Sequence, residues 1–149
     1  MAIILDGSDA IGDLGDALDA KLTTPGAWTA YTPTWAGVSS TGGVSTGAYT
    51  QIGRTVHFWA NYVLGTAVSI TAGISAPLPT GKAAGSEVLV NGVFIDMGTG
   101  YYAPLVVGQT LYAARAGVSY VDAETPSNTI PFTWATGDKI SVTGTYEAA

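Results

Sequence analysis

Few side chains in this 149-residue chain could do acid–base or metal chemistry. There is one histidine, His57, and there is no cysteine. A Ser-His-Asp triad would need a nucleophile in a strained, exposed turn and an orienting acid beside His57, and the chain has no GxSxG sequence. Carboxylates would have to complete any metal site, because no second histidine or cysteine exists. We therefore expect His57 to have a structural or interface role, and we expect no metal or other cofactor.

Carboxylates could also supply glycosidase chemistry, in which two acids flank the scissile bond. Glu87, Asp122 and Glu124 are available for such a pair, but Asp122 and Glu124 fall in an expected solvated loop. A separate acidic series stands near the N-terminus, at Asp6, Asp9, Asp13, Asp16 and Asp19. Its spacing is helical, whereas a calcium loop places oxygen ligands at alternate positions around a glycine. We expect the chain not to be an enzyme, with a glycan hydrolase as the weaker alternative.

Aromatic side chains could bind sugars, because exposed Tyr and Trp rings stack on sugar rings. The chain has 8 Tyr and 4 Trp. Packing in the core or between subunits is the alternative role for any one of these rings, because Tyr and Trp are enriched there too. Tyr101 and Tyr102 follow Gly98 and Gly100, so we expect at least one of their rings near a loop tip. These two tyrosines are the candidate contacts for a glycan or receptor.

The first segment, residues 1–26, predicts one short helix. Ser8 or Asp9 can cap a helix over roughly Ala10–Leu22, since their side-chain oxygens can accept from first-turn N–H groups. So short a helix is marginal alone in water, and it needs a partner: its own domain, sister helices or another protein. Pro25 and Gly26 end the segment. Its apolar residues are the candidate attachment and assembly surface: Ile3, Ile4 and Leu5, then the helical stripe Ile11, Leu14, Leu18 and Leu22.

Residues 27–149 predict a β domain. Apolar and polar residues alternate over Thr55–Val63 and over Lys139–Tyr146, the period of a half-buried strand. Asn91-Gly92 predicts a two-residue hairpin turn between Glu87–Val90 and Val93–Met97. Many short strands between turns predict a mainly β fold: a sandwich, jelly roll or barrel. Further strands are expected at Thr29–Trp35, Ala48–Ile52, Val68–Ala72, Tyr101–Val107, Thr110–Ala116 and Thr129–Trp134, and a loop at Val38–Gly47.

Charge is scarce: 11% of residues are charged, against about 25% in ordinary soluble domains. Either other subunits cover much of the surface, because interfaces are depleted in charge, or neutral polar groups solvate it. The net charge of −6 and the scattered Lys and Arg argue against nucleic-acid binding. The uncharged stretch Thr55–Gly81 contains Pro77 and Pro79, so we expect no membrane insertion. The N-terminus lacks the basic region of a secretion signal, and we expect synthesis in the cytoplasm.

Two segments resemble a known family. The sequence WTAYTPTW, followed after a Gly/Ser/Thr stretch by GAYTQIGRTVHF, and the sequence PFTWATGDKISVTGTYEAA are similar to a β module of bacteriophage tail-fibre and minor tail proteins, especially in phages of actinobacteria. The matching positions are Trp28, Tyr31, Pro33, Trp35, Gly47, Tyr49, Gly53, Arg54, Val56, Phe58, Trp134, Gly137, Asp138, Gly144 and Tyr146. The resemblance covers roughly Ala27–Ala149.

The resemblance implies an antiparallel, jelly-roll-like β-sandwich that forms a homotrimer. It also implies a non-enzymatic structural protein on the virion surface, with a receptor-binding role like that of a tail fibre. The partners would be sister chains, a tail component and a host cell-surface glycan. Only some 26 residues precede the module, whereas a fibre chain usually has a long front. The alternative is therefore a capsid decoration protein, or head fibre, bound to the major capsid protein.

Overall fold

The computed structural model describes residues 26–75, 77–79, 88–106, 110–116 and 121–149, and these residues form strands and turns without a helix. The first-segment helix and its apolar residues from Ile3 to Leu22 lie outside the described residues. The strands are β1 (Thr29–Tyr31), β2 (Ala36–Thr41), β3 (Val44–Ile52), β4 (Thr55–Val63), β5 (Thr66–Ser75), β6 (Leu89–Asp96), β7 (Tyr101–Val106), β8 (Tyr112–Ala116), β9 (Val121–Glu124) and β10 (Lys139–Glu147). The mainly β prediction is confirmed.

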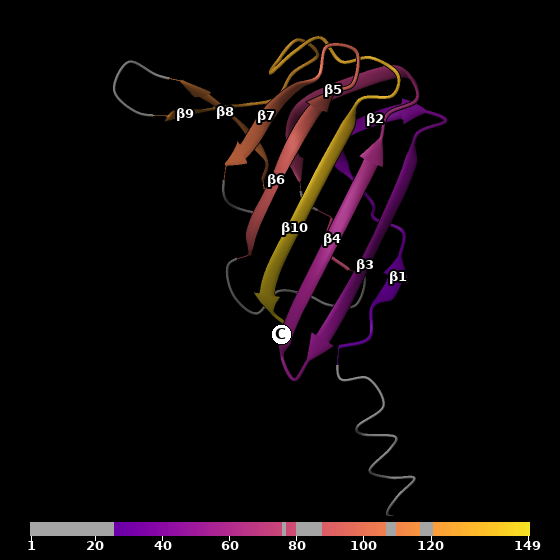
Figure 1. Cartoon of the computed structure of the whole chain (residues 1–149), viewed down its shortest axis with the longest axis vertical. Helices are drawn as coiled ribbons and strands as arrows, with labels where there is room; N and C mark the ends of the chain where they lie inside the picture. Colours follow the sequence, from indigo (N-terminus) through magenta and orange to yellow (C-terminus); the bar gives the residue numbers. More distant parts are fainter. Residues whose placement is uncertain (1–25, 76, 80–87, 107–109, 117–120) are drawn as a thin grey trace, which may run out of the picture.

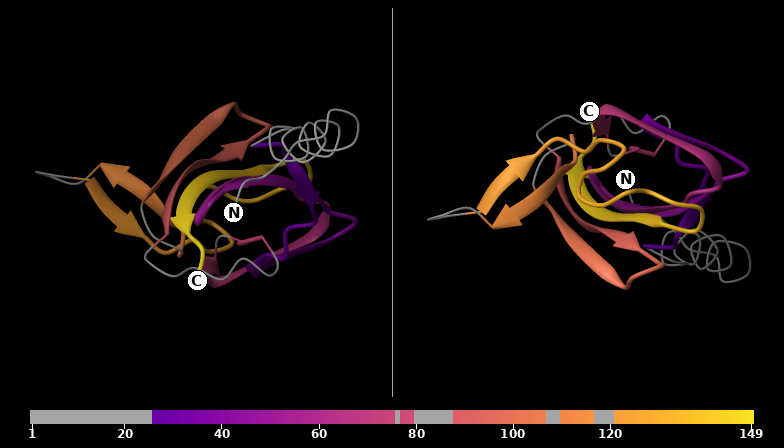
Figure 2. Two further views of the ribbon diagram at one scale, coloured as in Figure 1. Left: turned by 90° about the horizontal axis from the view of Figure 1, so that it is seen from below. Right: turned by 90° about the horizontal axis from the view of Figure 1, so that it is seen from above.

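The strands form two antiparallel sheets. Eight of them make one sheet in the order β1-β3-β4-β10-β6-β7-β8-β9, while β2 pairs with β5. Figure 1 shows β3, β4, β10 and β6 side by side, with the β2–β5 ladder behind their upper half. Seen along its length, the large sheet curves around the interior, and the β8–β9 hairpin extends away from the body (Figure 2). No helix in the described part of the chain is long and apolar enough to cross a membrane.

The alternating segments became the middle of the large sheet. The strand predicted at Thr55–Val63 is β4, with the same bounds, and the strand predicted from Lys139 is β10, which ends one residue later than expected. Every second side chain of each strand is buried, beginning at Val56 in β4 and at Ile140 in β10. β10 pairs with β4 along its whole length and with β6 along most of it. The period of two therefore identified the two strands at the centre of the sheet.

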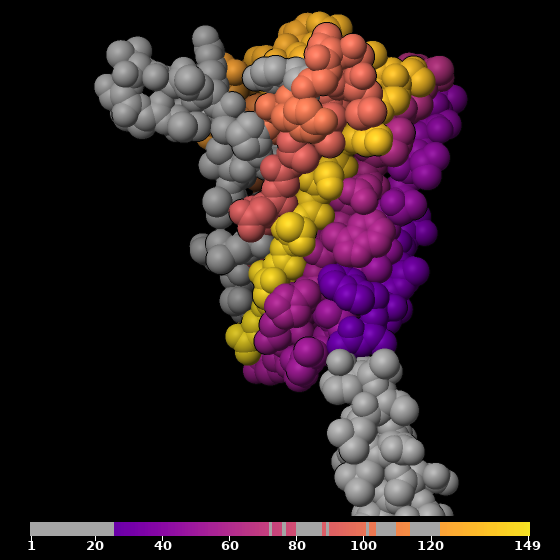
Figure 3. Space-filling view, in the orientation of Figure 1, coloured from indigo at the N-terminus to yellow at the C-terminus, as the bar shows by residue number. Residues whose placement is uncertain are grey.

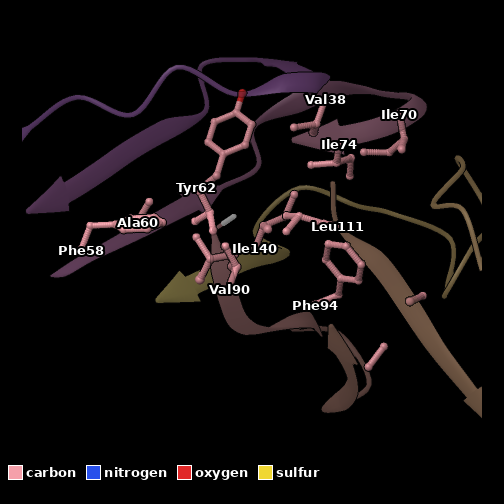
Figure 4. Close-up of a cluster of buried hydrophobic side chains, with 14 of the residues drawn as sticks. Val38, Phe58, Ala60, Tyr62, Ile70, Ile74, Val90, Phe94, Leu111 and Ile140 are labelled. Carbon is pink, nitrogen blue, oxygen red and sulfur yellow. The ribbon is translucent and has the colours of Figure 1, made fainter. Parts of the chain in front are cut away.

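The core lies between the curved sheet and the β2–β5 ladder. Phe58, Phe94 and Ile140 contribute fully buried side chains from the sheet, and Ile74 and Leu111 do so from the other side. Figure 4 shows Ile140, Leu111, Phe94 and Ile74 near one another, with Phe58 farther along β4. The backbone N–H of Leu111 donates to the carbonyl of Ile74 at 2.8 Å, which joins the two layers at the end of β5.

The hairpin prediction at Asn91-Gly92 is wrong. Both residues lie inside β6, where Asn91 pairs with Thr143 and Gly92 pairs with Val142 of β10. Neither residue has the positive φ that a type I′ turn requires. The chain turns later, after Asp96, because that carboxylate accepts hydrogen bonds from the N–H groups of Gly98 and Thr99 at 2.8 and 3.1 Å. The nonlocal pairing with β10 overrides the local turn preference.

Four other element predictions also need correction. The Gly/Ser/Thr-rich stretch 38–47, predicted as a loop, forms most of β2 and the start of β3, with a turn only at Gly42 and Gly43. The stretch holding Asp122 and Glu124, also predicted as a loop, is β9. The strand predicted at Thr129–Trp134 does not form: the segment begins in a turn closed by a single bridge between Ser127 and Ile130 and continues through a bend. The expected strand Thr29–Trp35 ends at Tyr31.

Candidate interaction surface

The titratable side chains of the described chain do not gather into a metal site. No group of three or more His, Cys, Asp or Glu residues within the described ranges could hold an ion. His57 lies exposed on β4, and its Nδ1 is 2.8 Å from the Oγ1 of Thr145 on β10. Of the acids considered for sugar hydrolysis, Glu87 lies outside the described residues. Asp122 and Glu124 both lie in β9, and Glu124 is half-buried opposite Ala113.

A buried aspartate fastens the loop before β10. Asp138 is 1% exposed. Its Oδ1 accepts from the N–H of Met97 at 3.0 Å, and its Oδ2 accepts from the N–H of Ala135 at 2.7 Å. Gly137 precedes it with a φ of 95°, a conformation that favours glycine. The Gly137-Asp138 pair thus ties the β6–β7 turn to the start of β10.

Trp134 closes the core beside this loop. Its indole N–H lies 3.0 Å from the carbonyl oxygen of Ser127 and 3.2 Å from that of Ile130, and it donates to both. The ring meets Phe94 edge-on, with 5.2 Å between centroids. The indole therefore gives a hydrogen-bond donor to two carbonyl groups of the turn at 127–130, and its ring covers the end of the core.

Three aromatic residues of the first motif, Tyr31, Trp35 and Tyr49, also have structural partners. The Tyr31 hydroxyl donates to the carbonyl of Pro77 at 2.8 Å, and its ring meets Tyr49 edge-on at 6.0 Å. Burial, with a smaller effect of Tyr146, raises the pKa of Tyr31 far above its usual range. The indole N–H of Trp35 donates to the Oγ of Ser45 at 3.1 Å. These contacts attach the entry strand to β3 and to the segment that follows β5.

The two ends of the motif meet at the β3–β4 turn. Gly53 turns the chain there with a φ of 59°. The Nε of Arg54 lies 3.0 Å from a Glu147 carboxylate oxygen, and the Arg54 carbonyl accepts from the N–H of Ala148 at 2.7 Å. Tyr146, beside them, packs edge-on against Phe58, and burial raises the pKa of Tyr146 to about 12. The first and last motif segments are therefore parts of one folded unit.

The strands leave one broad surface uncovered by the β2–β5 ladder, and we call it the outer face. It consists of side chains that point away from the core on β3, β4, β10 and β6. Cross-strand pairing aligns these side chains in three middle rows: Thr50, His57 and Thr145; Ala48, Trp59, Thr143 and Asn91; and Thr46, Asn61, Ser141 and Val93. Thr50 and Ala48 are buried, so apart from Thr46 the accessible part of the rows lies on β4, β10 and β6. Figure 3 shows the molecule from this side, with β10 in yellow between β6 and β4.

The outer face is neutral in the middle and apolar at its ends. The three middle rows contain no Asp, Glu, Lys or Arg. Trp28 and Ile52 are 55% and 54% exposed at the end where the described chain begins. Val44, Met97 and Tyr102 are 57%, 51% and 60% exposed at the opposite end. The charged residues Glu147 and Lys139 lie outside the middle rows, at the two ends of β10.

The structure places the aromatic candidate residues from the sequence in different environments. Tyr101 and Tyr102 are the first two residues of β7, directly after the turn at residues 97–100, where they pair with Asp96 and Ile95. Tyr102 is exposed. Trp28 differs from the other motif aromatics because it is exposed. The sequence did not reveal the outer face, since its rows exist only once β3, β4, β10 and β6 are in register. The one signal available was the second face of the two alternating strands, which carries no charge between Lys139 and Glu147.

No protein-family model, curated protein or solved structure matches this chain. We therefore take its function from its own residues.

Proposed function

We propose that this protein is a non-enzymatic structural protein of a bacteriophage virion. It is displayed on the particle surface as a homotrimer of jelly-roll-like modules, in the manner of a tail fibre or receptor-binding protein. The first segment, residues 1–26, anchors it to a tail component. The β domain from residue 27 faces outward and meets the host surface.

The meeting of the motif segments carries this proposal. Arg54 and Glu147 are 93 positions apart, and they form an ion pair with a 3.0 Å Nε–Oε1 distance. Asp138 and Trp134 each hold a turn next to the core through hydrogen bonds to backbone groups. Residues with such roles are those that a structural module must keep. This supports the idea that the motif marks a module of that kind and is not a chance pattern.

The chemistry of the described polar groups also favours display over catalysis. Both carboxylate oxygens of Asp138 accept hydrogen bonds from backbone N–H groups, and Glu147 forms an ion pair with Arg54. Asp96 caps its own turn, and its hydrogen bonds with the Thr99 side chain and with the Thr99 and Gly98 backbone lower its pKa. These three acids stabilise the fold, and the middle rows of the outer face carry mainly hydroxyl, amide, imidazole and indole groups.

Immunogold labelling of purified virions tests the location. We expect label on the tail tip. Label on the head would replace the tail role with capsid decoration, and virions without label would overturn the proposal altogether.

Removal of residues 1–22 tests the anchor. We expect a chain that keeps its far-ultraviolet circular dichroism spectrum but is missing from virions. The full-length Tyr102→Ala variant serves as the matched control, because an exposed β7 side chain should not affect incorporation. A truncated chain that still entered virions would refute the anchoring role.

Host adsorption tests the receptor contact. Phage carrying Tyr102→Ala or Tyr101→Ala should adsorb less to host cells while keeping normal amounts of the protein. Unchanged adsorption, together with no binding on a glycan array, would remove these tyrosines from the receptor contact.

A further inference from the structure

We propose that the outer face is where copies of this chain pack against one another. The inference rests on the homotrimer in the proposed function, and it adds the contact surface and the residues at its centre. The surface is that of the three middle rows, with Trp59 and Thr143 in the central row.

The first reason is the distribution of exposed apolar side chains. Within the described ranges, the large apolar residues with more than half of their surface exposed are Trp28, Val44, Ile52, Met97 and Tyr102. Trp28 adjoins Ile52 at one end of the outer face, and the other three stand at the opposite end, on β3 and the β6–β7 hairpin. The two groups are separated by the neutral middle rows and form no contiguous apolar patch. They mark the two ends of the face and leave the middle rows between them for a neutral partner.

The second reason is charge, which selects the partner. Residues 27–149 carry six Asp and Glu against four Lys and Arg, a net charge of −2, so copies of the β domain repel one another where their acids meet. The middle rows contain no Asp, Glu, Lys or Arg, so copies can meet there without burying an unpaired charge. An acidic or basic partner would find no opposite charge on these rows. A neutral face of the same kind is the better match, and a second copy of the chain supplies one.

The third reason is the position of the chain entry. Gly26 lies against Ile52 and Thr50, at the end of the outer face marked by Trp28. Copies that pack side by side in the same direction bring their Gly26 ends together. The first segments then leave the assembly from one end, where several weak anchors can act together on one virion site.

The polar side chains of the middle rows are already oriented for such a contact. The Oγ of Ser141 donates to the Oδ1 of Asn61 at 2.6 Å, which leaves the Asn61 amide group to donate outward. The His57 ring is held through Nδ1 by Thr145, which leaves its Nε2 for a partner. Fixed donors and acceptors around Trp59 suit an interface, where Trp is enriched and about one hydrogen bond forms per 100–200 Å².

The test places one charge at the centre of the face. Thr143 is exposed, and its Oγ1 donates to the Phe58 carbonyl at 3.1 Å. Thr143→Lys and Thr143→Glu change the net charge in opposite directions, yet both should weaken association about 100-fold or more. Thr143→Val also loses the hydrogen bond but adds no charge, so it should assemble normally. Thr71→Lys and Thr71→Glu, on the exposed side of β5, are the matched charge controls and should also assemble.

Sedimentation velocity of the full chain over a range of concentrations gives the readout, and circular dichroism shows that each variant is folded. A wild-type chain that is monomeric at every concentration overturns both this inference and the homotrimer, while leaving the virion location to immunogold. An oligomer that survives both Thr143 charges overturns the outer-face contact alone. A folded monomer that binds a neutral glycan array through Trp59, with loss in Trp59→Ser, would assign the face to sugar instead.

Discussion

Substitution of Asp138 tests whether a buried carboxylate contributes more to the free energy of unfolding than an exposed one. Its two oxygens accept from the N–H groups of Met97 and Ala135, at 3.0 and 2.7 Å, in a site where the residue is 1% exposed. Asp138→Asn keeps the shape but turns one acceptor into a donor, so one N–H loses its partner. Leaving a buried donor unsatisfied costs about 1–3 kcal/mol. We expect Asp138→Asn to lower the free energy of unfolding by about 1–3 kcal/mol, and Asp138→Ala by about 2–6 kcal/mol, because both donors are then orphaned.

Urea denaturation measures these changes in the free energy of unfolding. Every variant is measured at the same protein concentration, because self-association also contributes to the apparent stability. Asp96→Ala is the control, because Asp96 accepts three hydrogen bonds from Gly98 and Thr99 but stands in solvent, where water replaces the lost acceptor. The expected order of destabilisation is Asp138→Ala, then Asp138→Asn, then Asp96→Ala. If Asp96→Ala cost as much as Asp138→Ala, burial would not be what gives the Asp138 hydrogen bonds their value, and the reasoning would fail.

Three further predictions concern the core, the outer face and high pH. Phe94→Ala should lower the free energy of unfolding by about 3–5 kcal/mol, because Phe94 is fully buried against Trp134, and a loss below 1 kcal/mol in urea denaturation would contradict that packing. Thr50→Val should raise it by about 1 kcal/mol, since the buried Thr50 hydroxyl has no hydrogen-bond partner among the described residues; a loss in the same assay would mean that the hydroxyl is bonded. Burial raises the pKa of Tyr146 from 10.0 to about 12, so the stability from its neutral phenol is complete below pH 10 and lost as pH rises through about 12. Tyr146→Phe should therefore flatten the fall in the melting temperature between pH 10 and 12, and an unchanged slope would refute this.

The sequence predicted those strands whose burial is strictly one-sided. In β4 and β10, apolar residues alternate with polar ones because one face of each strand meets the core and the other meets solvent. This pattern is local, so it can be read without knowing the neighbours. The same alternation could not give the order of the strands, and β10 pairs with β4 and β6 across separations of more than 40 residues.

The errors have a common physical cause. Asn91-Gly92 has strong local turn chemistry, yet β10 offers the segment a full set of backbone partners, and the ladder prevails. The stretch 38–47 has the composition of a loop, but Val38 is buried in the core and Thr46 is paired with Asn61 of β4. Composition describes the average solvent exposure of a segment, whereas strand formation depends on a partner elsewhere in the chain.

The candidate surface was less predictable than the fold. Tyr102 was singled out from the glycines before it, and its exposure follows from its place on the outer side of β7. Trp59 was only one of many aromatics, because its central place depends on the register of β3, β4 and β10. The structural roles of Trp134 and Asp138 could be expected from the motif, but their hydrogen-bond partners could not.

The place of β10 has a consequence for synthesis of the chain. β4 and β6 lie on either side of β10 and do not pair with each other. During translation, both strands leave the ribosome before residues 139–147 exist, and each then presents an unpaired hydrogen-bonding edge. Such edges are templates for pairing with other chains. Nascent chains on neighbouring ribosomes of one message are thus exposed to mispairing until the last strand inserts, and messages cut short before codon 139 should yield aggregates.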